Sequence, residues 1–386
     1  MRIDGPMSDV RMNTRLRKDG ASNRAVAVPT WKIGFDPWAV ETRLSSIGNR
    51  NLAFVMRHTS LVVVLLTTPC SAAEPNLDAL RCDPAKVLGA DSCAKCHEKE
   101  FQQWKLTPHF ATFESLHRKP EAKAITKRLG LSTVKRNETC VKCHYTQQQK
   151  GDRERVVAGV SCESCHGAAK DWVTLHNDYG GTNVGKELES AEHREQRLTE
   201  SMAAGMNNPA NYYLVARQCL ACHTTPDEQL VNVGGHLPGS QEFEFVSWSQ
   251  GVVRHNFLRT GGMANATASQ AQLRVMYVVG VMADLEASMR GTAQATVKAT
   301  FGTAAAQRAA RLKQKLLEIN QLSSDPYVQQ ALDAALQAPL KLNQSETLLA
   351  AANLIGEAAF NFAKNARGND LAALDPLLPQ PNNYRQ

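Results

Sequence analysis

The sequence predicts a mainly α-helical protein with little sheet, in which a region rich in cysteine and histidine is followed by a C-terminal helical bundle. Three observations lead to this fold class. No segment alternates polar and apolar residues with the period of a strand. Segments 122–131 and 187–204 have the composition of charged helices. From about residue 265, cysteine and histidine are absent and Ala, Leu and Gln dominate.

One pentapeptide, C-x-x-C-H, occurs four times in the first of these two regions. Two cysteines three residues apart lie on nearly the same side of a helical turn, so both thiols can form thioether bonds to the vinyl groups of one porphyrin. The adjacent histidine then reaches the iron as its proximal ligand. The pattern predicts four covalently attached haem c groups, held by Cys93, Cys96 and His97; Cys140, Cys143 and His144; Cys162, Cys165 and His166; and Cys219, Cys222 and His223.

Two other interpretations of these cysteines are zinc binding and disulfide formation. Paired C-x-x-C segments form structural zinc sites in many proteins. Neither interpretation requires a histidine directly after the second cysteine, and all four copies have one. Eight of the ten cysteines belong to the pattern, and Cys82 is expected to be a plain thiol.

The spacing of the four motifs is uneven, with one short gap between His144 and Cys162. So short a link spans little distance in a compact fold, and we expect the second and third haems to be neighbours.

Six histidines outside the motifs are available for the opposite faces of the four irons. All six lie in the motif region, and none lies in the last 130 residues or so. His193 has the surroundings of a solvated helix face, and the role of His117 is undecided. Methionine is an alternative ligand, with Met202, Met206 and Met263 as candidates. The distal ligands that we predict are His109, His176, His236 and His255, with their pairing to individual haems left open.

An export signal is expected, because haem is attached to this motif outside the bacterial cytoplasm. Residues 56–73 have a short basic start, an apolar core over 61–66 and a small-residue cleavage site at 71–73. This arrangement is typical of a secretory signal peptide. We therefore predict a periplasmic protein with a signal peptide over 56–73.

The signal peptide divides the N-terminal part of the chain, and the change of composition near residue 265 divides the rest. Residues 1–55 are polar and mixed, and we interpret them as a non-native upstream extension; the alternative is an unusually long start of the signal. A lead-in over 74–90 is expected before a tetrahaem domain over 91–264 and a helical domain over 265–386. Membrane association is expected only if Cys70 is lipidated, and Thr67-Thr68-Pro69 before it does not favour this.

The net charge of +7 does not indicate a nucleic-acid partner. Residues 1–73 hold ten Lys and Arg against five Asp and Glu, so they account for +5 and the rest of the chain for only +2. Two propionates on each of four haems would bring the loaded mature protein to roughly −6. No basic stripe interleaved with aromatic residues is present in the mature part.

Four helices are expected in the C-terminal region, over 271–290, 304–322, 325–337 and 345–365. Ser324 or Asp325 and Ser345 are the expected N-caps of the last two. The apolar run 275–282 is too short to cross a membrane and has Arg274 and Asp284 on either side. A helical bundle is the expected architecture.

Residues of about 91–260 resemble the cytochrome c-554 family of periplasmic tetrahaem cytochromes. The resemblance rests on the four motifs, on Trp104 and His109, on the segment 159–167, and on Gly235-His236 with the stretch from Trp248 to His255. It implies a mainly helical fold with haems in closely stacked pairs that pass electrons in the periplasm. In the namesake type one haem lacks a sixth protein ligand, whereas this chain has more than enough spare histidines.

Three functions are compatible with these features. The favoured one is an electron carrier between redox donor and acceptor proteins, with mostly bis-histidine haems. The alternative is an enzyme that acts on a small nitrogen or sulfur species at a five-coordinate haem, near Lys170, Arg254 or Asn256. A docking role for the C-terminal helices is compatible with the first.

Overall fold

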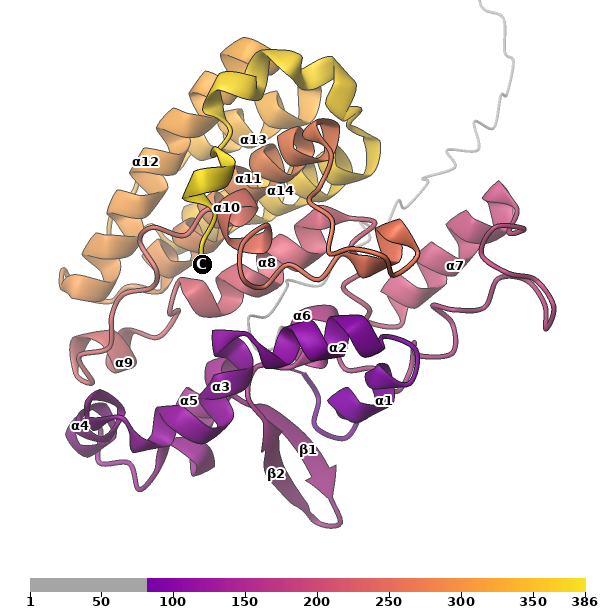
Figure 1. Ribbon diagram of the computed structural model, residues 1–386. Coiled ribbons are helices and arrows are strands. Elements are labelled where there is room, and N and C mark those ends of the chain that lie inside the picture. The colour runs from indigo at the N-terminus through magenta and orange to yellow at the C-terminus, as the bar shows by residue number, and fades with distance from the viewer. Residues whose placement is uncertain (1–81) are drawn as a thin grey trace, which may run out of the picture. The chain divides into compact units, whose positions relative to one another are not determined.

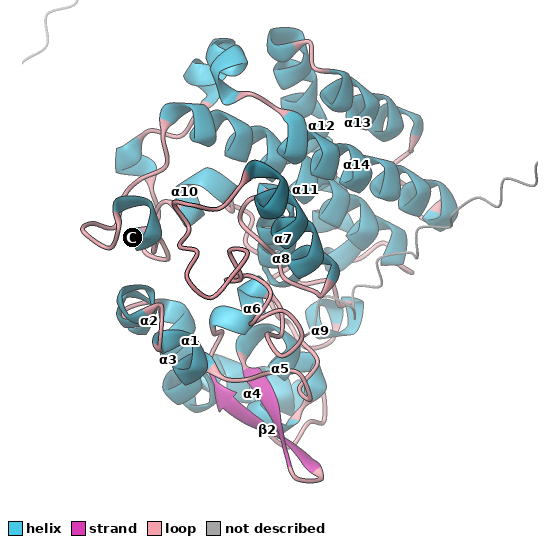
Figure 2. Cartoon of the chain, turned by 90° about the vertical axis from the view of Figure 1, so that its right-hand side faces the viewer, coloured by secondary structure: helices cyan, strands magenta, loops and turns pink. Residues whose placement is uncertain are grey.

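The computed structural model describes residues 82–386, and this part of the chain is mainly helical (Figures 1 and 2). Within these residues there are fourteen α-helices and one two-stranded sheet. The predicted fold class is therefore confirmed. The proposed upstream extension, the signal peptide, Cys70 and residues 74–81 of the lead-in lie outside the described residues.

The motif region consists of short helices joined by loops. Its ten α-helices contain between five and thirteen residues each. They are α1 (Ala90–Ala94), α2 (Glu98–Lys105), α3 (Pro108–Ser115), α4 (Pro120–Arg128), α5 (Glu138–His144), α6 (Cys162–His166), α7 (Ala191–Ala203), α8 (Tyr212–His223), α9 (Glu228–Asn232) and α10 (Phe245–Ser249). Short 3₁₀ turns at Leu116–Arg118, Val134–Arg136 and Phe257–Thr260 connect some of them.

The sheet is a β-hairpin that joins the second motif to the third. Strand β1 (Thr146–Lys150) pairs antiparallel with β2 (Arg153–Ala158), and Gly151 supplies the positive φ of 59° that the turn needs. At the base of the hairpin, the Thr146 hydroxyl bonds to the Ser161 and Ser164 hydroxyls at 2.9 and 2.8 Å. These bonds fix the start of the third motif against the end of the second.

The C-terminal region forms the predicted bundle. Its helices are α11 (Gln270–Gln294), α12 (Thr300–Ser323), α13 (Pro326–Gln337) and α14 (Ser345–Asn365), followed by 3₁₀ segments at Gly368–Leu377 and Pro381–Asn383. Figure 1 shows these helices in orange to yellow. Within the described residues, no helix is long and apolar enough to cross a membrane.

The predicted caps of the bundle helices were partly right. The Asp325 carboxylate accepts from the backbone N–H groups of Tyr327 and Val328, as expected of an N-cap. Ser345 was wrongly predicted, because it is already the first helical residue and Gln344 precedes it without a side-chain cap. The sequence contained one further cap, Ser269, which forms a reciprocal capping box with Gln272.

Helix α11 is the centre of the bundle. It packs against α12, α14 and the 3₁₀ segment Gly368–Leu377, and also against α8 and α10 of the motif region. Nineteen of its twenty-five residues are buried, and such a helix must be covered on nearly all sides. Because Tyr213, Ala216 and Leu220 of α8 belong to the same hydrophobic core, the helix of the fourth motif is anchored on the bundle.

Two charge pairs are buried around α11. Arg308 of α12 binds Asp284 in a bidentate pair, with nitrogen–oxygen distances of 2.6 and 2.8 Å. Glu286 accepts from Arg290 at 2.9 Å and from the Tyr213 hydroxyl at 2.7 Å. Each buried carboxylate is thus paired, which meets the requirement for placing charge in a low-dielectric core.

Candidate haem site

The four motifs adopt closely similar local structures. The second and fourth occupy the last turn of α5 and α8, the third forms α6, and the first spans the end of α1 and the turn before α2. In each helical turn the two cysteines lie on one side, as thioether attachment to one porphyrin requires. The local fold therefore suits the chemistry that the spacing predicts.

Each motif histidine faces one histidine from outside the motifs. The ring centres are 6.3 Å apart for His97 and His176, and 6.2 Å apart for His144 and His236. The other two pairs are His166 with His255 at 6.1 Å and His223 with His109 at 6.2 Å. The four outer histidines are those singled out in the sequence.

The spacing of these pairs fits a metal ion between the rings. Imidazole nitrogens bind a metal at about 2 Å, so two rings on opposite sides of one ion have centres about 6 Å apart. All four pairs lie within a range of 0.2 Å, from 6.1 to 6.3 Å, although their interplanar angles run from 29 to 85°. A common distance without a common angle is what coordination to a shared centre requires, whereas ring stacking would favour a common angle.

The outer histidines are positioned by local backbone features. His109 lies in the first turn of α3, where the Thr107 hydroxyl caps the helix. His236 follows Gly235, whose φ of 70° only glycine adopts readily. His176 ends a helical turn, and its backbone N–H donates to Trp172 O.

Hydrogen bonds at Nδ1 orient five of the eight rings. With Nδ1 donating, Nε2 keeps its lone pair for a metal. Four of these acceptors are backbone carbonyls and one is a hydroxyl: Asn207 O for His166 (3.3 Å), Val173 O for His176 (2.7 Å), Leu237 O for His236 (2.8 Å), Val253 O for His255 (2.7 Å) and Ser240 Oγ for His223 (3.0 Å).

Burial keeps three of the motif histidines neutral. It lowers the pKa of His144, His166 and His223 to about 4, with neighbouring histidines adding to the effect. A histidine must be neutral to donate a lone pair to a metal. These rings are therefore ready to act as ligands at neutral pH.

Contacts between motif helices give the order in which the four sites follow one another. Helix α6 contacts α1 and α8, and α8 contacts α5. The thiols follow the same order, since Cys93 interacts with Cys162 and Cys143 with Cys222. In space the four motifs therefore follow one another in the order first, third, fourth and second. The expected closeness of the second and third haems stays a prediction, although the hairpin does join their motifs.

The remaining histidines and methionines play other parts. His193 pairs with Glu189 at 2.9 Å, and its ring lies against Gly180. His117 lies in the turn before α4, and its Nδ1 is buried without a hydrogen-bond partner among the described residues. Met263 is 87% exposed, and Met206 accepts from the Asn208 amide.

Sequence reasoning missed two residues that hold the motifs in place. Glu163, inside the third motif, is 1% exposed and accepts from the backbone N–H groups of Leu88, Gly89 and Ala169. It ties the start of the first motif to the third. Ser240 holds His223 twice, through Oγ at Nδ1 and through its N–H to the histidine carbonyl at 2.8 Å. Neither residue type distinguishes itself in a sequence pattern.

Cys82 is a plain thiol, as the sequence suggested. Its Sγ donates to Glu163 O at 2.7 Å, and burial raises its pKa to about 12. A thiol with so high a pKa is unreactive at neutral pH.

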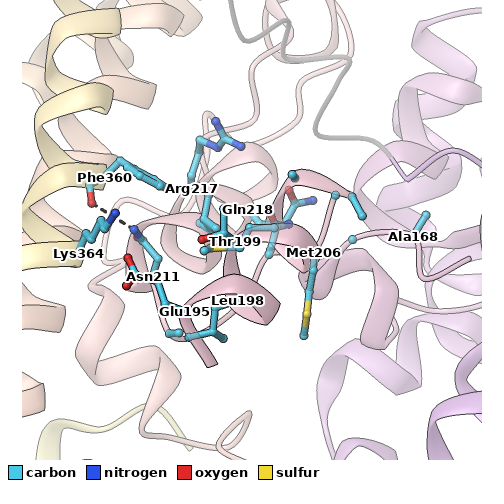
Figure 3. Close-up of a pocket in the computed structure, with 18 of the residues that line it drawn as sticks. Ala168, Glu195, Leu198, Thr199, Met206, Asn211, Arg217, Gln218, Phe360 and Lys364 are labelled. Atoms are coloured by element: carbon cyan, nitrogen blue, oxygen red, sulfur yellow. Dashed lines mark hydrogen bonds between the residues drawn. The ribbon is translucent and has the colours of Figure 1, made fainter. Parts of the chain in front are cut away.

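A cavity of about 1030 Å³ lies beside the third motif (Figure 3). Residues of α7, α8 and α14 line it. The side-chain amide of Asn211, the N-cap of α8, donates to the backbone carbonyl of Phe360 in α14. Asn207 at its wall accepts from His166 Nδ1, so the cavity is on the side of that ring away from the iron position. None of the eight paired histidines lines it.

Comparisons with known proteins agree with this geometry. Residues 92–167 match the family described as cytochrome c554 and c-prime. A segment of 104 residues is 34% identical to cytochrome c-554 of Nitrosomonas europaea, and it spans 25% of this chain and 44% of that protein. No solved structure matches significantly. These comparisons support the resemblance to the cytochrome c-554 family over this part of the chain, which spans less than half the length of the relative that it matches.

Proposed function

We propose that the protein is a periplasmic tetrahaem cytochrome that carries electrons between donor and acceptor proteins. The observation that supports this most strongly is the set of four histidine pairs with one common spacing. When bound, haem c supplies reversible one-electron chemistry. The chain's part is to attach the group through the cysteines, to ligate its iron from both sides, and to place the sites next to one another.

The proposal assigns each distal histidine to one haem. His176 serves the first motif, His236 the second, His255 the third and His109 the fourth. With two strong ligands each, the irons have no open position for a substrate. The cavity beside the third motif also has no paired histidine in its wall. Both features favour electron transfer over the alternative of an enzyme with a five-coordinate haem.

The assignment is tested by removing one distal ring at a time. His236→Ala is expected to leave the second haem with a single histidine and to make about one iron in four high-spin. Electron paramagnetic resonance at low temperature on the oxidised protein measures this. His193→Ala is the matched control, because His193 bonds Glu189 and faces no motif histidine. A fully low-spin His236→Ala protein would refute the assignment.

A further inference from the structure

The positive charge of residues 74–386 is concentrated in one segment beside the second motif. Residues 117–142 hold eight Lys and Arg against two Asp and Glu, a net charge of +6. Because residues 74–386 together carry +2, the rest of that stretch carries −4. A segment of positive charge among residues that are otherwise net negative calls for a cause.

Most of these cations are exposed and lack an acidic partner. Within residues 82–386, no ion pair involves Lys119, Lys123, Lys127 or Arg136, and all four are exposed. We call them the α4 basic surface. The other cations of the segment have contacts inside the protein: Arg118 with Glu114, Lys142 with Asp227, Lys135 over the Phe113 ring, and Arg128 with Gly234.

The placement of three of these lysines works against the stability of α4. Lys119, Lys123 and Lys127 are spaced by four residues and share one face of the helix, where like charges are destabilising. Lys119 is also the N-cap, and a positive charge there opposes the helix dipole. Only Lys127, in the last turn, complements the helix dipole, so the stability of α4 gives no reason for placing Lys119 and Lys123 on the same face.

The α4 basic surface adjoins the second histidine pair. Arg128, the last residue of α4, donates from Nε to Gly234 O at 2.7 Å, and its guanidinium lies against Gly235. His236, which follows Gly235 in the chain, faces His144. The second motif is also one end of the order in which the motif helices contact one another.

We propose that the α4 basic surface is the docking site of an acidic redox protein that exchanges electrons at the second motif. The inference rests on the proposed function, because it needs a redox-active site beneath the surface. Exposed cations around such a site attract an acidic partner and raise its rate of association. A protein partner is favoured over nucleic acid because residues 117–142 contain no Phe, Tyr or Trp to stack on bases.

The test compares two variants of equal charge. One is Lys119→Gln/Lys123→Gln/Lys127→Gln. Its control is Lys315→Gln/Lys341→Gln/Lys364→Gln, which removes three exposed lysines of the bundle. Arg128 is left intact because it holds the loop of His236. Flavodoxin, a small acidic redox protein, is the probe, and its binding to the oxidised haem-loaded protein is measured by calorimetry at low and high ionic strength.

Docking predicts that the first variant loses affinity for flavodoxin on the order of tenfold and that its salt dependence becomes shallower. The control variant is expected to bind as the parent does. Equal binding by all three proteins would overturn the proposal and would leave the cations to neutralise haem propionates. Stronger binding of the parent to phosphatidylglycerol vesicles or to DNA than to flavodoxin would also overturn it.

The same samples separate this proposal from the proposed function. Haem content and spin state are recorded on each before binding is measured. High-spin iron with lysine-dependent flavodoxin binding would refute the bis-histidine relay but not the docking surface. Four low-spin haems without such binding would refute the docking surface alone.

Discussion

The motif region and the C-terminal bundle bury their apolar residues in different ways. The second motif has a hydrophobic cluster of only four buried residues, Val134, Cys140, Val141 and Tyr145. In the bundle, α11 alone contributes twelve buried apolar residues to one hydrophobic core. Helices in the motif region are short, and those of the bundle have twelve to twenty-five residues.

This difference indicates which interactions stabilise each region. Isolated short helices are marginal in water, and they need a packing partner to persist. The bundle supplies such partners from its own side chains. We infer that the motif region takes them from the porphyrins, whose flat apolar faces would lie between the paired histidines.

The largest effect is expected when haem attachment is prevented. Replacing all eight motif cysteines with serine should unfold much of the motif region and leave α11–α14 folded, because only the latter has a large hydrophobic core of its own. Circular dichroism should show a partial loss of helix, and limited proteolysis with mass spectrometry should yield a resistant fragment from the bundle. If the motif region of this variant resisted proteolysis as well as the bundle does, the motif region would not depend on haem for its folding.

A smaller effect is expected at the buried ion pair between α11 and α12. Arg308→Leu leaves Asp284 buried without its partner and frees Ser240 O, so the free energy of unfolding should fall by about 3–5 kcal/mol. The double variant Asp284→Leu/Arg308→Leu removes both charges and should lose much less. Urea unfolding of the haem-loaded protein measures both. Equal losses would mean that packing, and not the unpaired charge, dominates.

The smallest effect concerns a partly exposed pair at the end of the bundle. Arg274 binds Asp375 at 2.7 and 2.8 Å and, with Gln270, lowers the pKa of Asp375 to about 2. Because this pKa lies below the value of about 3.9 in an unfolded chain, the pair stabilises the fold above pH 4 and loses this effect as the pH falls towards 2. Asp375→Asn should flatten the dependence of unfolding on pH in that window. An unchanged slope would contradict the assigned cause.

Much of this organisation was predictable from the sequence. A C-x-x-C-H motif is local, so its position and helical turn follow from neighbouring residues. The bundle helices have long periodic segments, and both ends of all four predicted ranges lie within four residues of the ends of the observed helices. The absence of histidine after residue 265 directed attention to the motif region, where the four predicted distal histidines each face one motif histidine.

The remainder depends on contacts that a local pattern does not encode. The pairing of His97 with His176, and of His223 with His109, joins residues 79 and 114 positions apart and is set by the packing of α1, α6 and α8. Ser240 and Glu163 are common residue types whose roles arise from burial. The α4 basic surface could have been found by counting charges segment by segment, because the balance of the whole mature chain conceals it.

The central claim is that four haems are each held between two histidines. Low-temperature electron paramagnetic resonance of the oxidised mature protein, with haem content quantified on the same sample, tests it most directly. The account predicts four haems per chain and low-spin signals only. A high-spin signal from about one haem in four, or fewer than four haems per chain, would contradict it.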